Sequence, residues 1–355
     1  GGGAAGVLLD ARTVDLHRKY HDKTIEYTMD RIDWVQNKGY STDSALTPEQ
    51  QVLVRRAARR RFERWPRLDE RDTHQVLLGD CPQRFCTGGP DVAGDPGDNV
   101  FVVSLPRRPS KLRHALHELH EHRVSATIVD AVDGDAILCR DDVSAHGVAV
   151  LPGYCGHSNH NIQLTTGEIG CFMSHYTIWQ HMVESNIESA LILEDDFDLQ
   201  EGFSQRLGEC LREADGEDWN ILYVGRSPVE PDLRVISEHV VEPGYTLWTV
   251  GYILRLGAAR ALLDARAHAR FAPLDEYFSI AMGRYTTAYN EFAPEWARHI
   301  PRVLRGLALT PPLVMPYVGS MFESDTAMLR SGTRYLKDLP QSISPAEADR
   351  QLREP

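Results

Sequence analysis

Three adjacent carboxylates are the clearest chemical signal in the sequence. Glu194, Asp195 and Asp196 directly follow the apolar run 190–193, and Asp198 comes two residues later. Adjacent carboxylates repel one another unless a cation compensates their charge. A hard divalent metal ion bound through carboxylate oxygens would remove that repulsion and could in turn hold a diphosphate. The alternative is an acidic loop in solvent, but the apolar strand that precedes the acids favours a metal site.

Cationic side chains follow the first predicted strand, 100–103. Arg107, Arg108 and Lys111 stand between the end of that strand and the start of the next helix. Cations beside a helix N-terminus favour binding of nucleotide phosphates. Asp133, after the second predicted strand, could accept hydrogen bonds from a ribose or a base, and a plain turn is the equal alternative.

Other polar residues have both a functional and a structural interpretation. Glu168 and His175 lie seven residues apart on a predicted helix, nearly on one face, so both can point into one cleft. A structural histidine is the alternative. Asp275 and Glu276 form a second acidic pair, for which the alternative is a helix N-terminal cap. We interpret Cys171, in an apolar run, as a buried structural thiol.

Two basic patterns do not support the functions that they first suggest. The histidines of the predicted helix 109–122 fail the zinc-protease motif H-E-x-x-H, because Glu121 stands at its last position, and we interpret them as a solvated helix face. The arginines between positions 55 and 67 have no aromatic series beside them for stacking RNA bases. We expect these arginines to dock against the acidic main domain.

These residues must be positioned by a larger framework. Apolar strands are predicted at 100–103, 126–129, 190–193 and 221–224, and they alternate with helices at 109–122, 170–184 and 202–214. The alternation indicates βαβ units and parallel strand pairs. We therefore predict an α/β fold, a three-layer αβα domain over residues 98–335. Ligands bind at the carboxyl ends of the strands in such sheets, which is where the acids lie.

The N-terminal region has a different character. We predict helices over 10–38 and from Pro48 to before Pro66, followed by a Gly-, Pro- and Asp-rich linker over 88–97. Residues 1–97 are thus expected to form a helical appendage and linker, and residues 336–355 a C-terminal tail.

Composition excludes several classes of protein. The 355 residues include 38 Lys and Arg against 51 Asp and Glu, a formal net charge of −13, and 42% are hydrophobic. These values are typical of globular proteins, and the acidic charge argues against a general nucleic-acid binder. No apolar run has the length of a membrane-spanning helix.

Several motifs, in order along the chain, resemble glycosyltransferase family 25. They are LTTGEIGCFMSH at 164–175, LEDD at 193–196, YVGR at 223–226 and PLDEYF at 273–278, with supporting matches at 131–134, 151–154, 245–249 and 324–326. The resemblance extends from about residue 99 to residue 335. Within the family it is greatest to the carboxyl-terminal transferase domain of the procollagen galactosyltransferases.

The resemblance implies a fold and a reaction. The fold would be of GT-A type, a Rossmann-like nucleotide-sugar transferase domain. The cofactor would be Mn²⁺ or Mg²⁺, and the donor a UDP-sugar, which is UDP-galactose in the collagen branch. That branch inverts the product configuration and uses hydroxylysine of a collagen-like protein as acceptor. The resemblance also favours the lumen of the endoplasmic reticulum or Golgi.

Individual roles follow from the resemblance as well. The metal ligands would be Glu194, Asp195, Asp196 and Asp325. Nucleotide-sugar contacts would come from Leu105, Arg108, Lys111, Asp133, Glu168, Ser174 and His175, and acceptor contacts from Tyr245 and Trp248. We expect the catalytic base in Asp275 or Glu276, with Glu168 and Asp325 as the next candidates. Ser104 stands where the family has Asn.

Two other functions remain open. One is a transferase of the same family that adds sugar to a bacterial-type lipooligosaccharide. The other is a non-catalytic relative that acts as an adhesion or interaction module. The intact carboxylates at 194–196 argue against the non-catalytic function.

Overall fold

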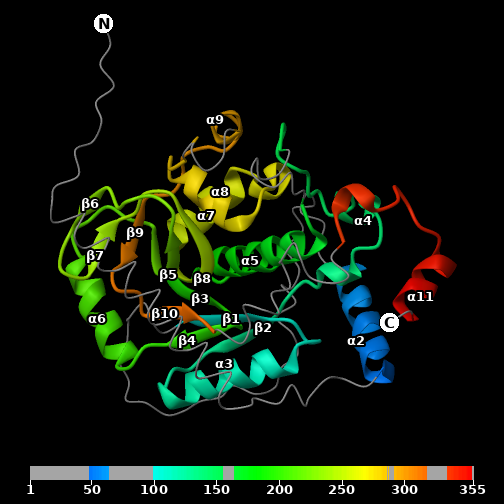
Figure 1. The fold of residues 1–355 in the computed structure, drawn as a ribbon, viewed down its shortest axis with the longest axis horizontal. Helices are drawn as coiled ribbons and strands as arrows, with labels where there is room; N and C mark the ends of the chain where they lie inside the picture. Colours follow the sequence, from blue (N-terminus) through cyan, green and yellow to red (C-terminus); the bar gives the residue numbers. More distant parts are fainter. Residues whose placement is uncertain are drawn as a thin grey trace, which may run out of the picture.

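The computed structural model describes residues 48–63, 99–154, 164–285, 287, 292–317 and 334–353. The predicted helix 10–38 and linker 88–97 lie outside these residues. In the described part, an eight-stranded sheet with the order β2-β1-β3-β8-β5-β9-β7-β6 lies between two layers of helices (Figure 1). This arrangement confirms the predicted three-layer α/β fold.

Figure 1 labels the elements of the three layers. The strands of the main sheet are β1 (Val100–Ser104), β2 (Thr127–Asp130), β3 (Ser189–Glu194), β5 (Ile221–Pro228), β6 (Arg234–Val235), β7 (Val240–Glu242), β8 (Thr246–Arg255) and β9 (Gly306–Leu309). One face carries α5 (Thr166–Glu184), α7 (Leu256–Asp264) and α8 (Leu274–Ala281), and the other carries α3 (Pro109–Glu121) and α6 (Phe203–Glu213). A small antiparallel sheet pairs β4 (Phe197–Leu199) with β10 (Val314–Pro316).

Shorter elements surround this framework. They are η2 (Gly134–Ala136), α4 (Arg140–Ser144), η3 (Ala267–Arg270), α9 (Ala293–Trp296), η4 (Leu336–Asp338), α11 (Pro345–Arg353) and the N-terminal α2 (Pro48–Glu63). Among the described residues, none of the helices has both the length and the apolar composition that a membrane crossing requires.

Strand β3 shows how the sequence builds two hydrophobic cores. Ala190 and Ile192 belong to the core cluster formed with α5, α7 and α8, whereas Leu191 and Leu193 belong to the cluster formed with α3 and α6. Side chains alternate between the two faces of a strand, so a strand covered on both faces must be apolar throughout. The continuous apolar run before the acids is explained by this burial.

The sheet is mixed rather than parallel. Strand β1 pairs in parallel with β2 and β3, as predicted, but β8 was not predicted and lies antiparallel between β3 and β5. Strand β5 ends at Pro228, which pairs with Thr246 at the start of β8. Because no helix in the described segment between them carries the chain back across the sheet, β8 must run in the opposite direction.

Helix α5 begins four residues earlier than predicted, at Thr166. A capping box explains the difference, because Thr165 Oγ1 accepts a hydrogen bond from the Glu168 backbone and Glu168 Oε2 accepts one from the Thr165 backbone. Close backbone contact fixes where the helix sits. A Cβ atom at Gly170 would lie 2.4 Å from the carbonyl oxygen of Val132, so only glycine allows α5 to press against the segment after β2.

Helix α2 packs on the main domain next to η2 and α11 (Figure 1). Arg59 donates hydrogen bonds to Asp142 at 2.6 and 2.9 Å, and Arg56 forms a 2.9 Å ion pair with Asp349. Phe62 is buried in the core cluster on the α5 side. Arg59 therefore docks against the main domain, as expected, whereas Arg56 pairs with an acid of the C-terminal tail.

Candidate active site

The acidic run lies at the carboxyl end of β3, between β1 and β8 in the sheet. Asp195 is buried, and its Oδ2 accepts hydrogen bonds from the Ser104 hydroxyl at 2.7 Å and the Leu105 backbone at 3.3 Å. Glu194 and Asp196, on either side of it, are partly exposed. Asp195 therefore ties the end of β1 to β3, while Glu194 and Asp196 are the acids that a ligand can reach.

Glu194 lies in an environment with excess negative charge. The Thr249 hydroxyl donates to its Oε1 at 2.5 Å, and Nε2 of His175 lies 3.9 Å from the same oxygen. Burial raises the pKa of Glu194 to about 8, and the charges of Asp196 and Asp275 contribute to the rise. A cation bound beside Glu194 would stabilise the charged carboxylate, because it would offset both the cost of burying that charge and the repulsion from Asp196 and Asp275.

Basic residues surround the end of β1. Nζ of Lys111 lies 3.3 Å from Asp196 Oδ2. Arg107, not Arg108, reaches Asp133, with its Nε 2.9 and 3.1 Å from the two carboxylate oxygens. Burial raises the pKa of Asp133 even though Arg107 opposes the rise. Arg108 stands at the N-cap position of α3. The residues predicted to bind the donor after β1 and after β2 therefore lie in one region.

Ser174 and His175 make contacts within the protein. The Ser174 hydroxyl donates to the Gly170 carbonyl at 2.6 Å and accepts from the Val132 backbone at 2.8 Å. His175 is fully buried, with Nδ1 2.8 Å from the Tyr252 hydroxyl, and burial lowers its pKa to about 3. Ser174 therefore holds the segment after β2 against α5, and His175 is neutral beneath the acids.

Glu168 lies near the acids of α8. Burial raises the pKa of Glu168 to about 7, although hydrogen bonds from Thr165 oppose the rise and the charges of Asp275 and Glu276 add to it. The side chain is partly exposed. A carboxyl group with a pKa near neutrality can exchange a proton at physiological pH. Glu168 therefore qualifies chemically as an alternative base.

Asp275 and Glu276 differ strongly in exposure. Glu276 has no exposed surface, whereas Asp275 is partly exposed. Oδ2 of Asp275 accepts the Trp248 backbone N–H at 3.1 Å, and Oδ1 accepts that of Glu276 at 2.8 Å. Trp248 has a φ of +68° and an exposed fraction of 36%. Asp275 thus holds an unfavourable backbone conformation that presents the indole ring to solvent, while Tyr245 is buried.

The structure brings most of the predicted site residues into one region, but Asp325 lies outside the described residues. Thr249 and Tyr252 were not among the predicted site residues, and they reach the site from strand β8, which was not predicted either. The interpretation of Cys171 as a buried structural thiol needs correction. The residue is half-buried, and burial raises the pKa of its thiol well above the usual value, as expected for a buried thiol, but its sulfur lies within 4.8 Å of ligand atoms of His175 and Glu194, so its surroundings are not purely structural.

His114 does not lie on a solvated helix face, contrary to our prediction. Its Nε2 lies 2.9 Å from Asp198 Oδ1, and its ring stacks on Tyr317 with a centroid separation of 3.8 Å. One turn further along α3, Glu118 Oε2 accepts the Leu199 backbone N–H at 2.9 Å. This face of α3 therefore packs along β4, the strand that follows the acidic run.

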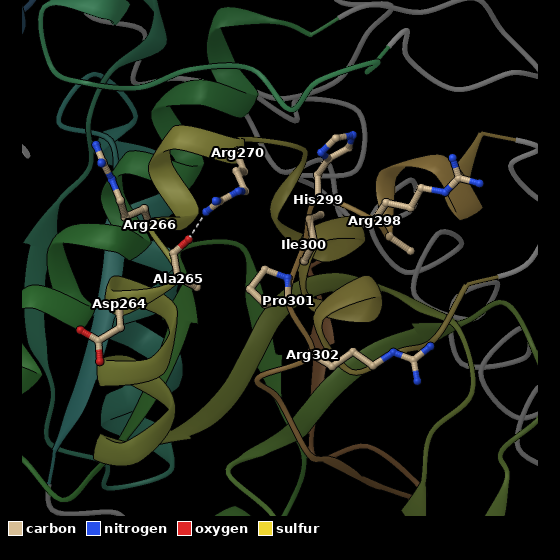
Figure 2. A pocket seen from close by; sticks show the side chains of 10 residues that line it. Asp264, Ala265, Arg266, Arg270, Arg298, His299, Ile300, Pro301 and Arg302 are labelled. Atoms are coloured by element: carbon tan, nitrogen blue, oxygen red, sulfur yellow. Dashed lines mark hydrogen bonds between the residues drawn. The ribbon is translucent and has the colours of Figure 1, made fainter.

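A pocket of about 510 Å³ lies elsewhere, between α7, η3 and the segment after α9 (Figure 2). Its arginines include Arg270, which donates to the Ala265 carbonyl at 2.5 Å, and Arg298, which pairs with Glu295 at 2.7 Å. No residue of the acidic strand end lines it. The arrangement of charges, rather than cavity volume, therefore identifies the candidate active site.

The residues at the end of β3 fit a hard divalent cation. Glu194 and Asp196 offer carboxylate oxygens, the ligands that Mn²⁺ and Mg²⁺ prefer. The negative charges of Asp196 and Asp275 act on Glu194, and the Thr249 hydroxyl that donates to Glu194 is neutral, so the acidic cluster calls for compensation by a positive charge. A bound cation would supply that compensation.

Comparison with known proteins identifies the family of this chain. A family model described as glycosyltransferase family 25 (LPS biosynthesis protein) matches residues 98–278, just over half of the chain. A Danio rerio protein named procollagen galactosyltransferase 1 is 35% identical over 239 residues, covering 64% of this chain and 38% of the relative. Human procollagen galactosyltransferase 2 is 32% identical over 239 residues, covering 64% and 37%.

Another relative has a different name. A Bos taurus protein named probable inactive glycosyltransferase 25 family member 3 is 37% identical over 238 residues, covering 64% of this chain and 39% of the relative. The chain thus spans about two fifths of the length of the curated relatives that it matches. The family match covers strand β3 with the acidic run that follows it, and also Asp275 on α8. The chain belongs to glycosyltransferase family 25.

Proposed function

We propose that the chain is a metal-dependent, inverting glycosyltransferase that transfers galactose from UDP-galactose to a hydroxyl acceptor, with hydroxylysine of a collagen-like protein as the substrate. The observation that carries the proposal is the pair Glu194 and Asp196 at the carboxyl end of β3, within a domain of this family. The names of two relatives, which are procollagen galactosyltransferases, support the donor sugar and the acceptor.

The donor site would lie over the ends of β1 and β3. Mn²⁺ or Mg²⁺ bound to Glu194 and Asp196 would supply positive charge to the diphosphate as UDP departs. Lys111, already 3.3 Å from Asp196, brings a second positive charge to the same position. Asp133 and Arg107 hold each other at the neighbouring strand end, where a nucleoside would be bound. In this proposal, the groups that stabilise the diphosphate charge are different from those that bind the nucleoside.

The acceptor site would lie on the β8 and α8 side. The exposed indole of Trp248 offers an apolar surface for a sugar or peptide, and Asp275 fixes its backbone. In a single displacement, the acceptor oxygen bonds to the anomeric carbon while the bond to the UDP oxygen breaks. We assign the acceptor proton to Asp275 rather than Glu276, because Glu276 has no exposed surface for an acceptor to reach.

A non-catalytic role is the second candidate, because some relatives are named inactive. The acids at 194–196 and the accessible Asp275 favour catalysis. Slow, metal-dependent hydrolysis of a UDP-sugar without acceptor would separate the two functions, because a protein that only binds partners would not cleave the donor.

The experiment that tests the proposal is a donor and acceptor screen of the full chain with Mn²⁺. UDP-galactose and UDP-glucose would be offered with a hydroxylysine-containing collagen-like peptide and with a lipooligosaccharide acceptor. We expect transfer from UDP-galactose to the peptide, with inverted configuration at the anomeric carbon. Transfer only to the lipooligosaccharide would contradict the acceptor, and donor binding without any hydrolysis or transfer would contradict catalysis.

A further inference from the structure

Three metal-ligand side chains of different chemical types meet beside the acidic strand end. Candidate ligand atoms of Cys171, His175 and Glu194 all lie within 4.8 Å of one another. Cys171 and His175 are one turn apart on α5 and share a face, and Glu194 ends β3. Thiolate, imidazole and carboxylate together suit a borderline-soft cation such as Zn²⁺, whereas Mn²⁺ and Mg²⁺ prefer oxygen ligands alone.

His175 gives an independent indication of a ligand. Its side chain has no exposed surface, and among the residues that the structure describes its Nε2 has no hydrogen-bond partner. Buried polar atoms in proteins are normally satisfied, so an orphan nitrogen calls for an explanation. The other ring nitrogen, Nδ1, lies 2.8 Å from the Tyr252 hydroxyl. Metal-binding histidines make this kind of outer hydrogen bond, which orients the ring.

The spacing is close to that of a zinc site. In tetrahedral zinc sites, bond lengths of about 2.0–2.3 Å place the ligand atoms about 3.3–3.6 Å apart. Nε2 of His175 and Oε1 of Glu194 are 3.9 Å apart, so a small side-chain adjustment brings both within bonding distance of one ion. The Thr249 hydroxyl, 2.5 Å from Oε1, holds the carboxylate in place. Three protein ligands leave a fourth position for water.

We propose that Cys171, His175 and Glu194 form a zinc-binding site that inhibits the protein when it is filled. As the sulfur–zinc bond forms, the Cys171 thiol releases its proton to solvent. Glu194 is also a ligand of the proposed donor-binding cation, so Zn²⁺ at this site withdraws it from the donor. That inhibitory consequence rests on the proposed function, whereas the binding of zinc does not.

Cobalt substitution tests the site without any activity measurement. Co²⁺ bound to a thiolate gives a strong charge-transfer absorption in the near ultraviolet that oxygen and imidazole ligands do not give. The full chain, first freed of metal with a chelator, should show this band on addition of Co²⁺. Cys171→Ser should lose the band and bind Zn²⁺ at least about tenfold more weakly, in line with the losses seen when metal sites are altered.

Cys210→Ser is the matched control, because Cys210 is a buried free cysteine on α6, on the opposite face of the sheet. This variant should keep the cobalt band and the zinc affinity of the unaltered chain. Thermal unfolding without metal would verify that both variants are folded. A cobalt band that survives in Cys171→Ser, or is absent from the unaltered chain, overturns the site.

Inhibition is measured separately, as loss of Mn²⁺-dependent UDP-galactose hydrolysis on addition of Zn²⁺. Zinc should inhibit the unaltered chain and Cys210→Ser at concentrations that fill the site, and Cys171→Ser should need at least about tenfold more. Zinc that binds through Cys171 without inhibiting would overturn the inhibitory role. If the chain never hydrolyses donor with any metal, the proposed function fails and the cobalt band alone decides on the site.

Discussion

At the scale of single residues, the acids of this site differ in accessibility more than in type. Asp195 is occupied by hydrogen bonds that join β1 to β3, and Glu276 is fully buried. Glu194, Asp196 and Asp275 are partly exposed, so a ligand can reach them. Adjacent carboxylates in the sequence therefore take different roles, because each side chain has its own hydrogen-bond partners and exposure.

The assignment of the base predicts unequal effects of two amide substitutions. Asp275→Asn should lower the turnover of transfer by about 10²–10⁴-fold, because the acceptor proton loses its base, and should leave UDP affinity unchanged. Glu168→Gln should keep most of the turnover. The measurement is steady-state kinetics together with UDP titration.

The pH dependence separates the two acids further. Because burial raises the pKa of Glu168 to about 7, a reaction that used Glu168 as base would accelerate as the pH rises through about 7. Our assignment predicts that Glu168→Gln leaves the shape of the pH profile unchanged. Loss of turnover in Glu168→Gln, with an active Asp275→Asn, would move the base to Glu168.

At the scale of secondary-structure elements, α3 is attached to the strand after the acidic run by polar side chains on one face. Lys111, His114 and Glu118 contact Asp196, Asp198 and the Leu199 backbone in turn. The solvated face predicted for the histidines holds for His117 and His120, which are exposed, but not for His114, because periodicity does not reveal that Asp198 of strand β4 lies beneath the helix.

The strands of the main sheet differ in how far the sequence alone predicts them. Strands β1, β2 and β3 could be predicted because each contains a short, largely apolar run. Strand β8 could not, because Thr249 and Gly251 interrupt its apolar pattern and its direction depends on where β5 ends. The contributions of Thr249 and Tyr252 to the site were missed for that reason.

The contact between α2 and α4 predicts a pH-dependent stability. Burial would raise the pKa of Asp142, but hydrogen bonds from Arg59 and from the backbone at Leu138 and Cys139 lower it overall. A lowered carboxyl pKa stabilises the fold above the unfolded value of about 3.9, and this stabilisation is lost as the pH falls below it. The unaltered chain should therefore be more stable than Asp142→Asn at neutral pH, and the difference should shrink toward about pH 3.

Chemical denaturation at a series of pH values measures this difference. Asp141→Asn is the matched control, because Asp141 is the exposed neighbour on the same helix and does not contact Arg59. It should change stability little at any pH. A pH-independent difference for Asp142→Asn would contradict the electrostatic account of this contact.

At the scale of the whole molecule, the part that matches the family and the N-terminal helix share a core. Phe62 of α2 is buried in the same cluster as α5, and its ring meets His146 edge-on at 4.7 Å. Cys171 and His175 of α5 lie beside Glu194, whereas α2 contacts η2, α4 and α11. Helix α2 is therefore expected to contribute to stability and not to donor binding.

Two substitutions on α2 test this separation. Phe62→Ala should destabilise the protein by about 3 kcal/mol, because it leaves a cavity in the core. Leu53→Ala, at a position with 64% exposure on the same helix, should change the free energy of unfolding by less than about 0.5 kcal/mol. Both folded variants should bind UDP with Mn²⁺ like the unaltered chain. A selective loss of UDP affinity in Phe62→Ala would show that α2 supports the nucleotide site.

The most direct test of the account is the affinity for UDP with and without Mn²⁺, measured by calorimetry on the full chain and on Asp196→Asn. We predict that Mn²⁺ strengthens UDP binding by at least about tenfold in the unaltered chain and in the control Asp215→Asn, an exposed acid after α6. Asp196→Asn should lose that gain, because a carboxylate ligand of the cation is removed. UDP affinity that is independent of Mn²⁺, or a full Mn²⁺ effect in folded Asp196→Asn, would contradict a metal-dependent UDP-sugar site at the end of β3.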